Sequence, residues 1–95
     1  MGEAVVGRMV VAEGVVQGVG YREFTRRWAL RLNISGWVRN RGDGSVEARV
    51  RGQPRDVEAM LLKLREGPPG ASVLDLRVTA DEGEGEAGFS VRPTL

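Results

Sequence analysis

Two segments of this chain carry apolar residues at helical spacing, and in each of them the apolar residues form a single stripe. Residues 22–32 place Phe24, Trp28 and Leu32 on one face, because side chains four positions apart lie one above the other on a helix. The second segment begins at Pro54, whose missing N–H costs nothing at a helix start. Its stripe consists of Val57, Met60, Leu61 and Leu64. Two such helices can cover only one face of a sheet, so the other face is expected to be open.

The segments around these helices have the alternation or the β-branched composition of strands. They are residues 8–16, 34–40, 45–51 and 73–80, with Phe89 and Val91 marking a short last strand. Residues 45–51 alternate between apolar and polar side chains, which is typical of an antiparallel strand with one dry face. In residues 73–80 the positions expected to point inward are Leu74, Leu76, Val78 and Ala80. The turn Arg41-Gly-Asp-Gly44 predicts a hairpin, because Asp-Gly supplies the positive φ angles that such turns need.

The predicted order is therefore β-α-β-β-α-β with a short extra strand. This order indicates an α+β fold, a two-layer α/β sandwich with ferredoxin-like topology and an antiparallel sheet. A chain of 95 residues suits one domain over residues 1–95. No stretch approaches the roughly 20 apolar residues of a membrane span. No signal-peptide pattern is present either, so we expect a cytoplasmic protein without membrane contact.

The chain contains no cysteine and no histidine. Disulfides, thiolate metal sites, Ser-His and Cys-His nucleophilic pairs and imidazole acid–base chemistry are therefore excluded. Any catalysis must use arginine, carboxylates, amides, hydroxyls, backbone N–H groups or the single lysine, Lys63.

Charge is unevenly distributed, although the net charge is only +1. Residues 8–55 hold ten arginines against four acidic residues, whereas residues 81–86 hold Asp81, Glu82, Glu84 and Glu86. A positive first half suits an anionic ligand, either a small phosphate compound or a nucleic acid. A solvated, arginine-rich surface would explain the same composition.

A glycine-bearing loop, Gly14-Val-Val-Gln-Gly18-Val-Gly20-Tyr-Arg22, runs from the end of a strand into the start of a helix. Glycines at such a junction let backbone N–H groups converge, and the helix N-terminus adds unpaired donors and partial positive charge. The positive charge of Arg22 is unfavourable at the start of a helix, where the helix dipole is also positive. An anion bound in front of Arg22 would explain its position. The loop matches neither a Walker A motif nor a dinucleotide fingerprint. A tight β-α turn with a surface arginine is the alternative.

Asn40 is unexpected near the end of a strand, because asparagine is disfavoured there. By parity it shares the apolar face with Val38. Either it begins the turn or its amide orients a water molecule.

Together these residues resemble the acylphosphatase family. The resemblance rests on Gly14-x-Val-Gln-Gly-Val-x-x-Arg22 and on Gly36-Trp-Val-x-Asn40-x-x-x-Gly44-x-Val46, and the end of the chain, Gly88-Phe-Ser-Val-Arg92, is similar to the family's last strand. It covers nearly the whole chain and implies hydrolysis of a small-molecule acyl phosphate to carboxylate and inorganic phosphate by water attack on phosphorus, with no metal and no cofactor. A monomer is expected.

The resemblance also implies the roles of individual residues. Arg22 binds the phosphate and Asn40 orients the attacking water. The backbone cradle beneath the phosphate consists of Gln17, Gly18, Val19, Gly20 and Tyr21. Arg41 departs from the family pattern, which commonly has a small hydroxyl residue after the asparagine.

Two other functions fit the same topology. One is a nucleic-acid-binding module that uses the open sheet face, with Arg49, Arg51 and Trp37 on it. Aromatic residues make up only 5% of the chain, and the central strands lack the aromatic motif of RNA-recognition sheets, so we do not expect a nucleic-acid partner. The other is a regulatory domain that binds phosphate without turnover.

Overall fold

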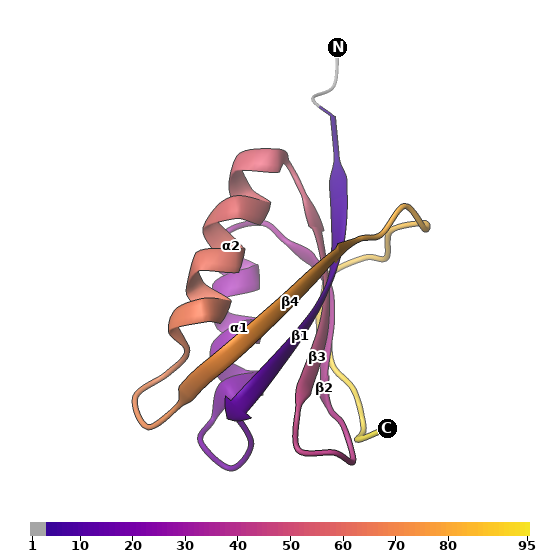
Figure 1. Cartoon of the computed structure of the whole chain (residues 1–95). Helices are drawn as coiled ribbons and strands as arrows, with labels where there is room; N and C mark the ends of the chain where they lie inside the picture. Colours follow the sequence, from indigo (N-terminus) through magenta and orange to yellow (C-terminus); the bar gives the residue numbers. More distant parts are fainter. Residues whose placement is uncertain (1–3) are drawn as a thin grey trace.

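The computed structural model describes residues 4–95. Its elements, in chain order, are β1 (Val6–Val15), α1 (Tyr21–Arg31), β2 (Ser35–Asn40), β3 (Val46–Gly52), α2 (Pro54–Glu66), β4 (Ser72–Ala80) and β5 (Phe89–Val91). Every predicted helix and strand is present, with its ends within two residues of the predicted ones. Both helices pack on one face of the sheet, as Figure 1 shows, so the predicted two-layer α+β sandwich is confirmed.

The strands form one sheet in the order β4-β1-β3-β2-β5. The pairs β1·β3, β1·β4 and β2·β3 are antiparallel, as the ferredoxin-like topology requires. The short strand β5 differs from the predicted antiparallel arrangement, because it runs parallel to β2. After β4, at one edge of the sheet, the chain crosses the open face to the opposite edge. There β5 runs opposite to β4 and therefore parallel to β2, so the sheet is mixed.

The buried face of α1 differs from the stripe that periodicity predicts. Tyr21, Thr25 and Ala29 face the core and are 2% exposed or less, whereas Phe24 and Trp28 are only half-buried. The small side chains of Thr25 and Ala29 allow α1 to pack closely against the sheet. The Thr25 hydroxyl donates to the Tyr21 carbonyl at 2.8 Å, which satisfies this buried polar group. The aromatic stripe consequently lies on the flank of α1, where the Lys63 ammonium of α2 contacts the Trp28 ring.

The prediction that Leu74 points inward is wrong. Leu76 is buried and Val78 is half-buried, but Leu74 is 80% exposed. The register of the β1·β4 pair shifts between Glu13 and Gly14. This bulge reverses the alternation, so that Val73 packs against the core in place of Leu74. Ala80, at the end of the edge strand, is also exposed.

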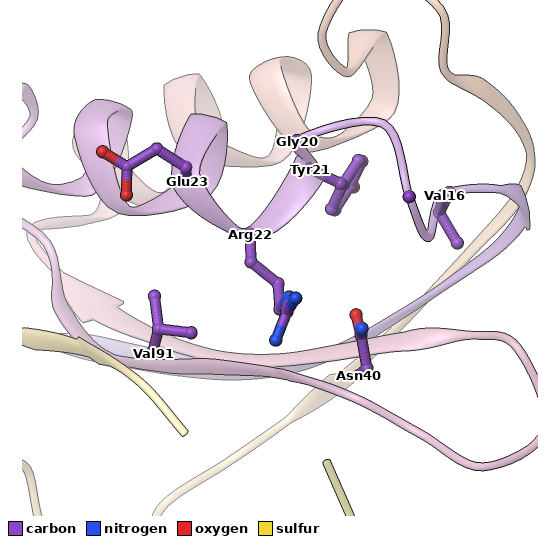
Figure 2. A pocket seen from close by; sticks show the side chains of 8 residues that line it. Val16, Gly20, Tyr21, Arg22, Glu23, Asn40 and Val91 are labelled. Carbon is purple, nitrogen blue, oxygen red and sulfur yellow. The ribbon is translucent and has the colours of Figure 1, made fainter. Parts of the chain in front are cut away.

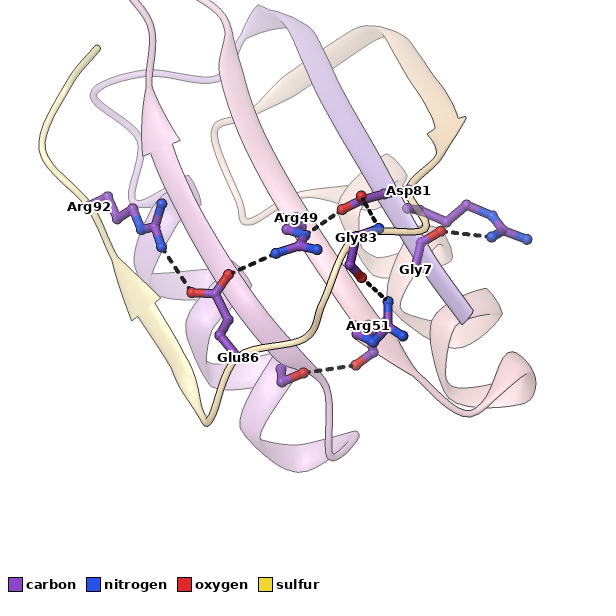
Figure 3. A network of polar contacts seen from close by, with 9 residues as sticks. Gly7, Arg49, Arg51, Asp81, Gly83, Glu86 and Arg92 are labelled. Atoms are coloured by element: carbon purple, nitrogen blue, oxygen red, sulfur yellow. Dashed lines mark hydrogen bonds and ion pairs between the residues drawn. The ribbon is translucent and has the colours of Figure 1, made fainter. Parts of the chain in front are cut away.

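The open face of the sheet is partly covered by residues 81–88, as Figure 3 shows. The Arg49 guanidinium pairs with Asp81 and, at 3.3 Å, with Glu86. Arg51 Nη1 donates to the Gly83 carbonyl at 2.8 Å. Residues of this same segment therefore pair with the charge of Arg49 and hold the Arg51 side chain by a backbone carbonyl. Among residues 4–95, no helix is long and apolar enough to span a membrane.

Candidate active site

A pocket of about 280 Å³ opens between the start of α1 and the strands β2 and β5. Figure 2 shows side chains from three elements converging on it. Of the residues assigned to the site from the sequence, those that line it are Gly18, Gly20, Tyr21, Arg22 and Asn40. The structure thus brings together the loop, the arginine and the amide from separate parts of the chain.

The loop between β1 and α1 requires glycine at two positions. Gly18 and Gly20 have φ angles of 76° and 82°, a left-handed conformation that other residues rarely adopt. No heavy atom lies within 4 Å of the position that a Cβ would occupy at either residue. The conformation, rather than lack of space, therefore accounts for these glycines, and it turns the backbone so that the chain enters α1 beside the pocket.

Backbone donors of this loop have no partner in the part of the chain that the structure describes. Among residues 4–95, no backbone carbonyl accepts a hydrogen bond from the N–H groups of residues 17–22. Gly20 is the N-cap of α1 and supplies no side-chain oxygen to cap it. The free donors and the positive end of the helix dipole make this loop suited to an oxyanion.

Arg22 lies in the first turn of α1 with its side chain directed into the pocket (Figure 2). Its neighbours Arg26 and Arg27 are paired with Glu23, at 2.7 and 3.1 Å. No acidic side chain among residues 4–95 pairs with Arg22. The Arg22 guanidinium can therefore bind two oxygens of an anion in the pocket.

Asn40 ends β2 on the sheet face that packs against the helices, as parity predicts. Its amide points from the sheet towards the start of α1 and lies beside the Arg22 guanidinium (Figure 2). Within the described residues, its Oδ1 atom is buried and has no hydrogen-bond partner. A buried acceptor without a partner is costly unless a bound molecule satisfies it. The Asn40 amide is thus available to a molecule bound in the pocket.

The side chains of Gln17 and Val19 make contacts away from the pocket, and these contacts do not involve the backbone N–H groups assigned to the cradle. Neither of them lines the pocket. Val19 packs against the core. The Gln17 carboxamide Nε2 donates to the carbonyls of Arg41 and Ser45, at 2.8 and 2.9 Å, and so joins the loop to the β2–β3 turn.

Hydrogen bonds within the β2–β3 turn stabilise its conformation. Gly44 N–H donates to the Arg41 carbonyl at 3.1 Å, which closes the predicted turn. Asp43 accepts from both the hydroxyl and the N–H of Ser45, at 2.6 and 3.0 Å. These hydrogen bonds, that of the hydroxyl above all, lower the pKa of Asp43. Arg41 is not among the residues that line the pocket, so its side chain does not add a second charge to the pocket wall.

Three further residues line the pocket that sequence reasoning did not assign to it: Val16, Glu23 and Val91. Val16 and Val91 give it apolar walls and have no polar chemistry by which a motif could reveal them. The Glu23 carboxylate points away from Arg22 in Figure 2 and is bound by Arg26 and Arg27. The bond from Arg26, followed by that from Arg27, lowers its pKa to about 2, which makes Glu23 a poor base.

Fold and pocket together define a small α+β protein with a site suited to an oxyanion, and comparison with known proteins agrees with this class. The acylphosphatase family model matches residues 8–91. An acylphosphatase of Rhodospirillum rubrum is 51% identical over 87 residues, which cover 92% of this chain and 96% of that protein. The chain belongs to the acylphosphatase family, and its activity is the hydrolysis of acyl phosphates.

Solved structures agree with this assignment. The acylphosphatase from Bacillus subtilis superposes with a TM-score of 0.89 at 33% identity, covering 92% of this chain and 98% of that one. An acylphosphatase from Coxiella burnetii superposes with a TM-score of 0.89 at 34% identity, covering 93% of each chain. The ferredoxin-like fold predicted from element order is therefore the fold of these relatives.

Proposed function

We propose that Arg22, Asn40 and the backbone of residues 17–21 carry out acyl phosphate hydrolysis in this protein. Arg22 and the N–H groups of the loop bind the phosphoryl oxygens, and the Asn40 amide holds a water molecule opposite the acyl oxygen. The observation that supports this most directly is the unpartnered, buried Asn40 Oδ1 atom in the pocket that also receives the Arg22 side chain. Gln17 acts through its side chain by fixing the loop against the turn.

The reaction is an in-line displacement at phosphorus. The water oxygen forms a bond to phosphorus while the bond between phosphorus and the acyl oxygen breaks, and its electron pair leaves with the carboxylate. The proton of the water passes to a phosphoryl oxygen of the substrate, since Glu23 is a poor base. A loose transition state of this kind needs positioning and charge stabilisation rather than covalent catalysis. A carboxylate is a good leaving group, so an arginine, an amide and backbone donors are sufficient.

We propose that this chemistry needs neither a metal nor a cofactor. Residues 4–95 contain no cluster of three carboxylates placed to hold a metal ion. The groups in the pocket are a guanidinium, an amide and backbone donors, which bind anions rather than cations.

The test is hydrolysis of benzoyl phosphate by protein treated with a chelator, with inorganic phosphate as inhibitor. We expect full activity after chelation and competitive inhibition by phosphate. Loss of activity that returns on adding a divalent cation would refute the metal-independent mechanism. Noncompetitive inhibition by phosphate would place the anion outside the catalytic pocket.

The open sheet face gives little support to nucleic-acid binding. Arg49 and Arg51 are both engaged by residues 81–88, and Trp37 is 7% exposed, with the guanidinium groups of Arg39 and Arg92 over its ring. A nucleic acid would have to displace the acidic segment to reach these side chains. We further propose a monomer located in the cytoplasm. Light scattering from the purified protein tests the monomer, and cell fractionation tests the location.

A further inference from the structure

Residues 92–95, which we call the edge segment, continue past β5 along the outer edge of β2. Figure 1 shows this yellow end of the chain beside the β2–β3 hairpin. The Arg92 N–H donates to the Val38 carbonyl at 2.8 Å, and the Leu95 N–H donates to the Asn40 carbonyl at 3.1 Å. The edge segment therefore holds the backbone of the residue whose amide lies in the catalytic pocket.

The backbone of Asn40 faces this outer edge and not β3. In an antiparallel ladder, pairs of residues that exchange hydrogen bonds alternate with pairs that do not. The Arg41 N–H donates to the Ser45 carbonyl at 2.9 Å, so the adjacent pair, Asn40 and Val46, is of the kind without hydrogen bonds. The Asn40 N–H and carbonyl thus point away from β3. The bond from Leu95 reaches the Asn40 carbonyl from this outer side.

Asn40 lies where β2 ends, which makes the outer bond important for its position. Strand β5 pairs with β2 only as far as Val38, two residues before Asn40. The end of a strand opens more readily than its centre when fewer hydrogen bonds hold it. The Asn40 amide is joined to its Cα through a single carbon, so a displacement of the Asn40 backbone displaces the amide in the pocket.

The edge segment is itself anchored to the open face of the sheet. Arg92 Nη2 pairs with Glu86 at 2.9 Å, and Glu86 also pairs with Arg49 of β3 at 3.3 Å (Figure 3). The Arg92 guanidinium lies 4.8 Å from the centre of the Trp37 ring. Pro93 follows, and its ring fixes the backbone φ angle. These contacts limit the positions that the rest of the edge segment can take.

We propose that the Leu95 N–H positions Asn40 for the reaction by holding the Asn40 carbonyl. This inference rests on the proposed function, in which the Asn40 amide holds the attacking water. Leu95 is a positioning residue, because it acts through the backbone of Asn40 and takes no part in the chemical step. Its side chain is 67% exposed, so its contribution comes from the backbone N–H. Phosphate binding, which the proposed function assigns to Arg22 and the loop, does not depend on it.

The test compares Leu95→Pro, which removes the N–H, with the conservative variant Leu95→Ala, which keeps it. We expect kcat for benzoyl phosphate to fall about tenfold in Leu95→Pro, because small displacements of a positioning group cost rates of this order. Leu95→Ala should restore the parent kcat. The inhibition constant of inorganic phosphate should be the same in the parent and in both variants. Both are expected to fold, since the side chain at this position is exposed.

Combination with Asn40→Ala shows whether Leu95 acts through Asn40. Leu95→Pro should lower kcat no further once the amide is absent, because substitutions that act through one group are not additive.

Three results overturn the proposal: an unchanged kcat in Leu95→Pro, the same proportional loss with and without the Asn40 amide, or weaker phosphate inhibition in Leu95→Pro. The last would show that the edge segment supports the whole pocket. An unchanged kcat in Asn40→Ala alone would instead refute the proposed function.

Discussion

Gln17 and Arg41 are joined by a hydrogen bond from the Gln17 Nε2 atom to the Arg41 carbonyl, at 2.8 Å. The same nitrogen also donates to the Ser45 carbonyl. One side chain thereby connects the loop before α1 to the residue that follows Asn40. This connection holds the loop against the turn that follows Asn40, even though the two lie in different parts of the chain.

Gln17→Ala tests this connection. We expect kcat/KM for benzoyl phosphate to fall about tenfold to a hundredfold, because small displacements of catalytic groups cost rates of this order. The free energy of unfolding should fall by about 1–2 kcal/mol, since two hydrogen bonds are lost, although the carbonyls of Arg41 and Ser45 keep their backbone donors, Gly44 N–H and Arg41 N–H. Steady-state kinetics and urea denaturation measure the two effects.

Gln53→Ala is the matched control for Gln17→Ala. Gln53 is the N-cap of α2, and its side chain makes no capping hydrogen bond. Its replacement should leave kcat/KM unchanged. If the two glutamine variants had equal activity, the bridge from Gln17 would have no part in positioning the site.

Asn40→Ala should separate catalysis from phosphate binding. We expect kcat to fall about a hundredfold, because the water loses its positioning group. The inhibition constant of inorganic phosphate should stay the same, since the Arg22 guanidinium and the loop donors remain. Asn33→Gly, which preserves the positive φ of 58° at the other asparagine, is the control. Loss of phosphate inhibition in Asn40→Ala would show that Asn40 binds the anion itself.

The single tyrosine provides a test of the packing beneath the loop. The Tyr21 hydroxyl donates to the Leu64 carbonyl at 2.6 Å and so joins the start of α1 to the end of α2. Tyr21→Phe should lower the free energy of unfolding by about 1–2 kcal/mol at neutral pH, because the buried carbonyl loses its donor. Activity should be retained, since the proposed function uses only the backbone of Tyr21. A variant as stable as the parent would contradict this role.

Alkaline titration of the same group has a defined sign. Burial raises the pKa of Tyr21 above its ordinary value. The stabilisation from the neutral phenol is therefore complete below about pH 10 and is lost as the pH rises further, because the unfolded chain ionises first. Urea denaturation between about pH 9 and 12 should show a steeper decline for the parent than for Tyr21→Phe. Tyrosinate absorbance appearing before unfolding would contradict this expectation.

Gly36 tests the packing of β2 against β3. A Cβ at this position would overlap the Arg49 carbonyl oxygen, and φ is 140°. Gly36→Ala is expected to destabilise the protein by about 3 kcal/mol or more, which places it in the most damaging class of substitutions. Gly70→Ala, where φ is 91° but no atom lies within 4 Å, should cost only about 1–2 kcal/mol of backbone strain. Circular dichroism during thermal unfolding compares them, and equal melting temperatures would contradict the packing.

Local patterns were enough to predict the order of the elements, the hairpin and the residue types of the pocket. The alternation in residues 45–51 predicts which face of β3 is buried, and Val46, Ala48 and Val50 are indeed buried. The paired motifs around Arg22 and Asn40 name five of the residues that line the pocket, but they do not reveal its apolar walls, Val16 and Val91.

The remaining features depend on contacts between distant residues. Leu74 is exposed because the β1·β4 register shifts, and no local pattern around residue 74 reveals a shift that involves Gly14. Thr25 is buried with its hydroxyl bonded to the Tyr21 carbonyl, and a prediction from apolar periodicity does not count a polar residue as part of the core. The bridge from Gln17 spans 24 residues and depends on where the β2–β3 turn lies.

Arg22→Ala compared with Arg55→Ala tests the central claim most directly. Each arginine is the second residue of its helix, so the two variants are matched in their effect on a helix N-terminus. We predict that Arg22→Ala remains folded, loses hydrolysis of benzoyl phosphate by about a thousandfold or more, as expected when a main charge-stabilising group is removed, and is no longer inhibited by inorganic phosphate. Arg55→Ala should retain the parent kcat/KM. Comparable activity in the two folded variants would contradict the account.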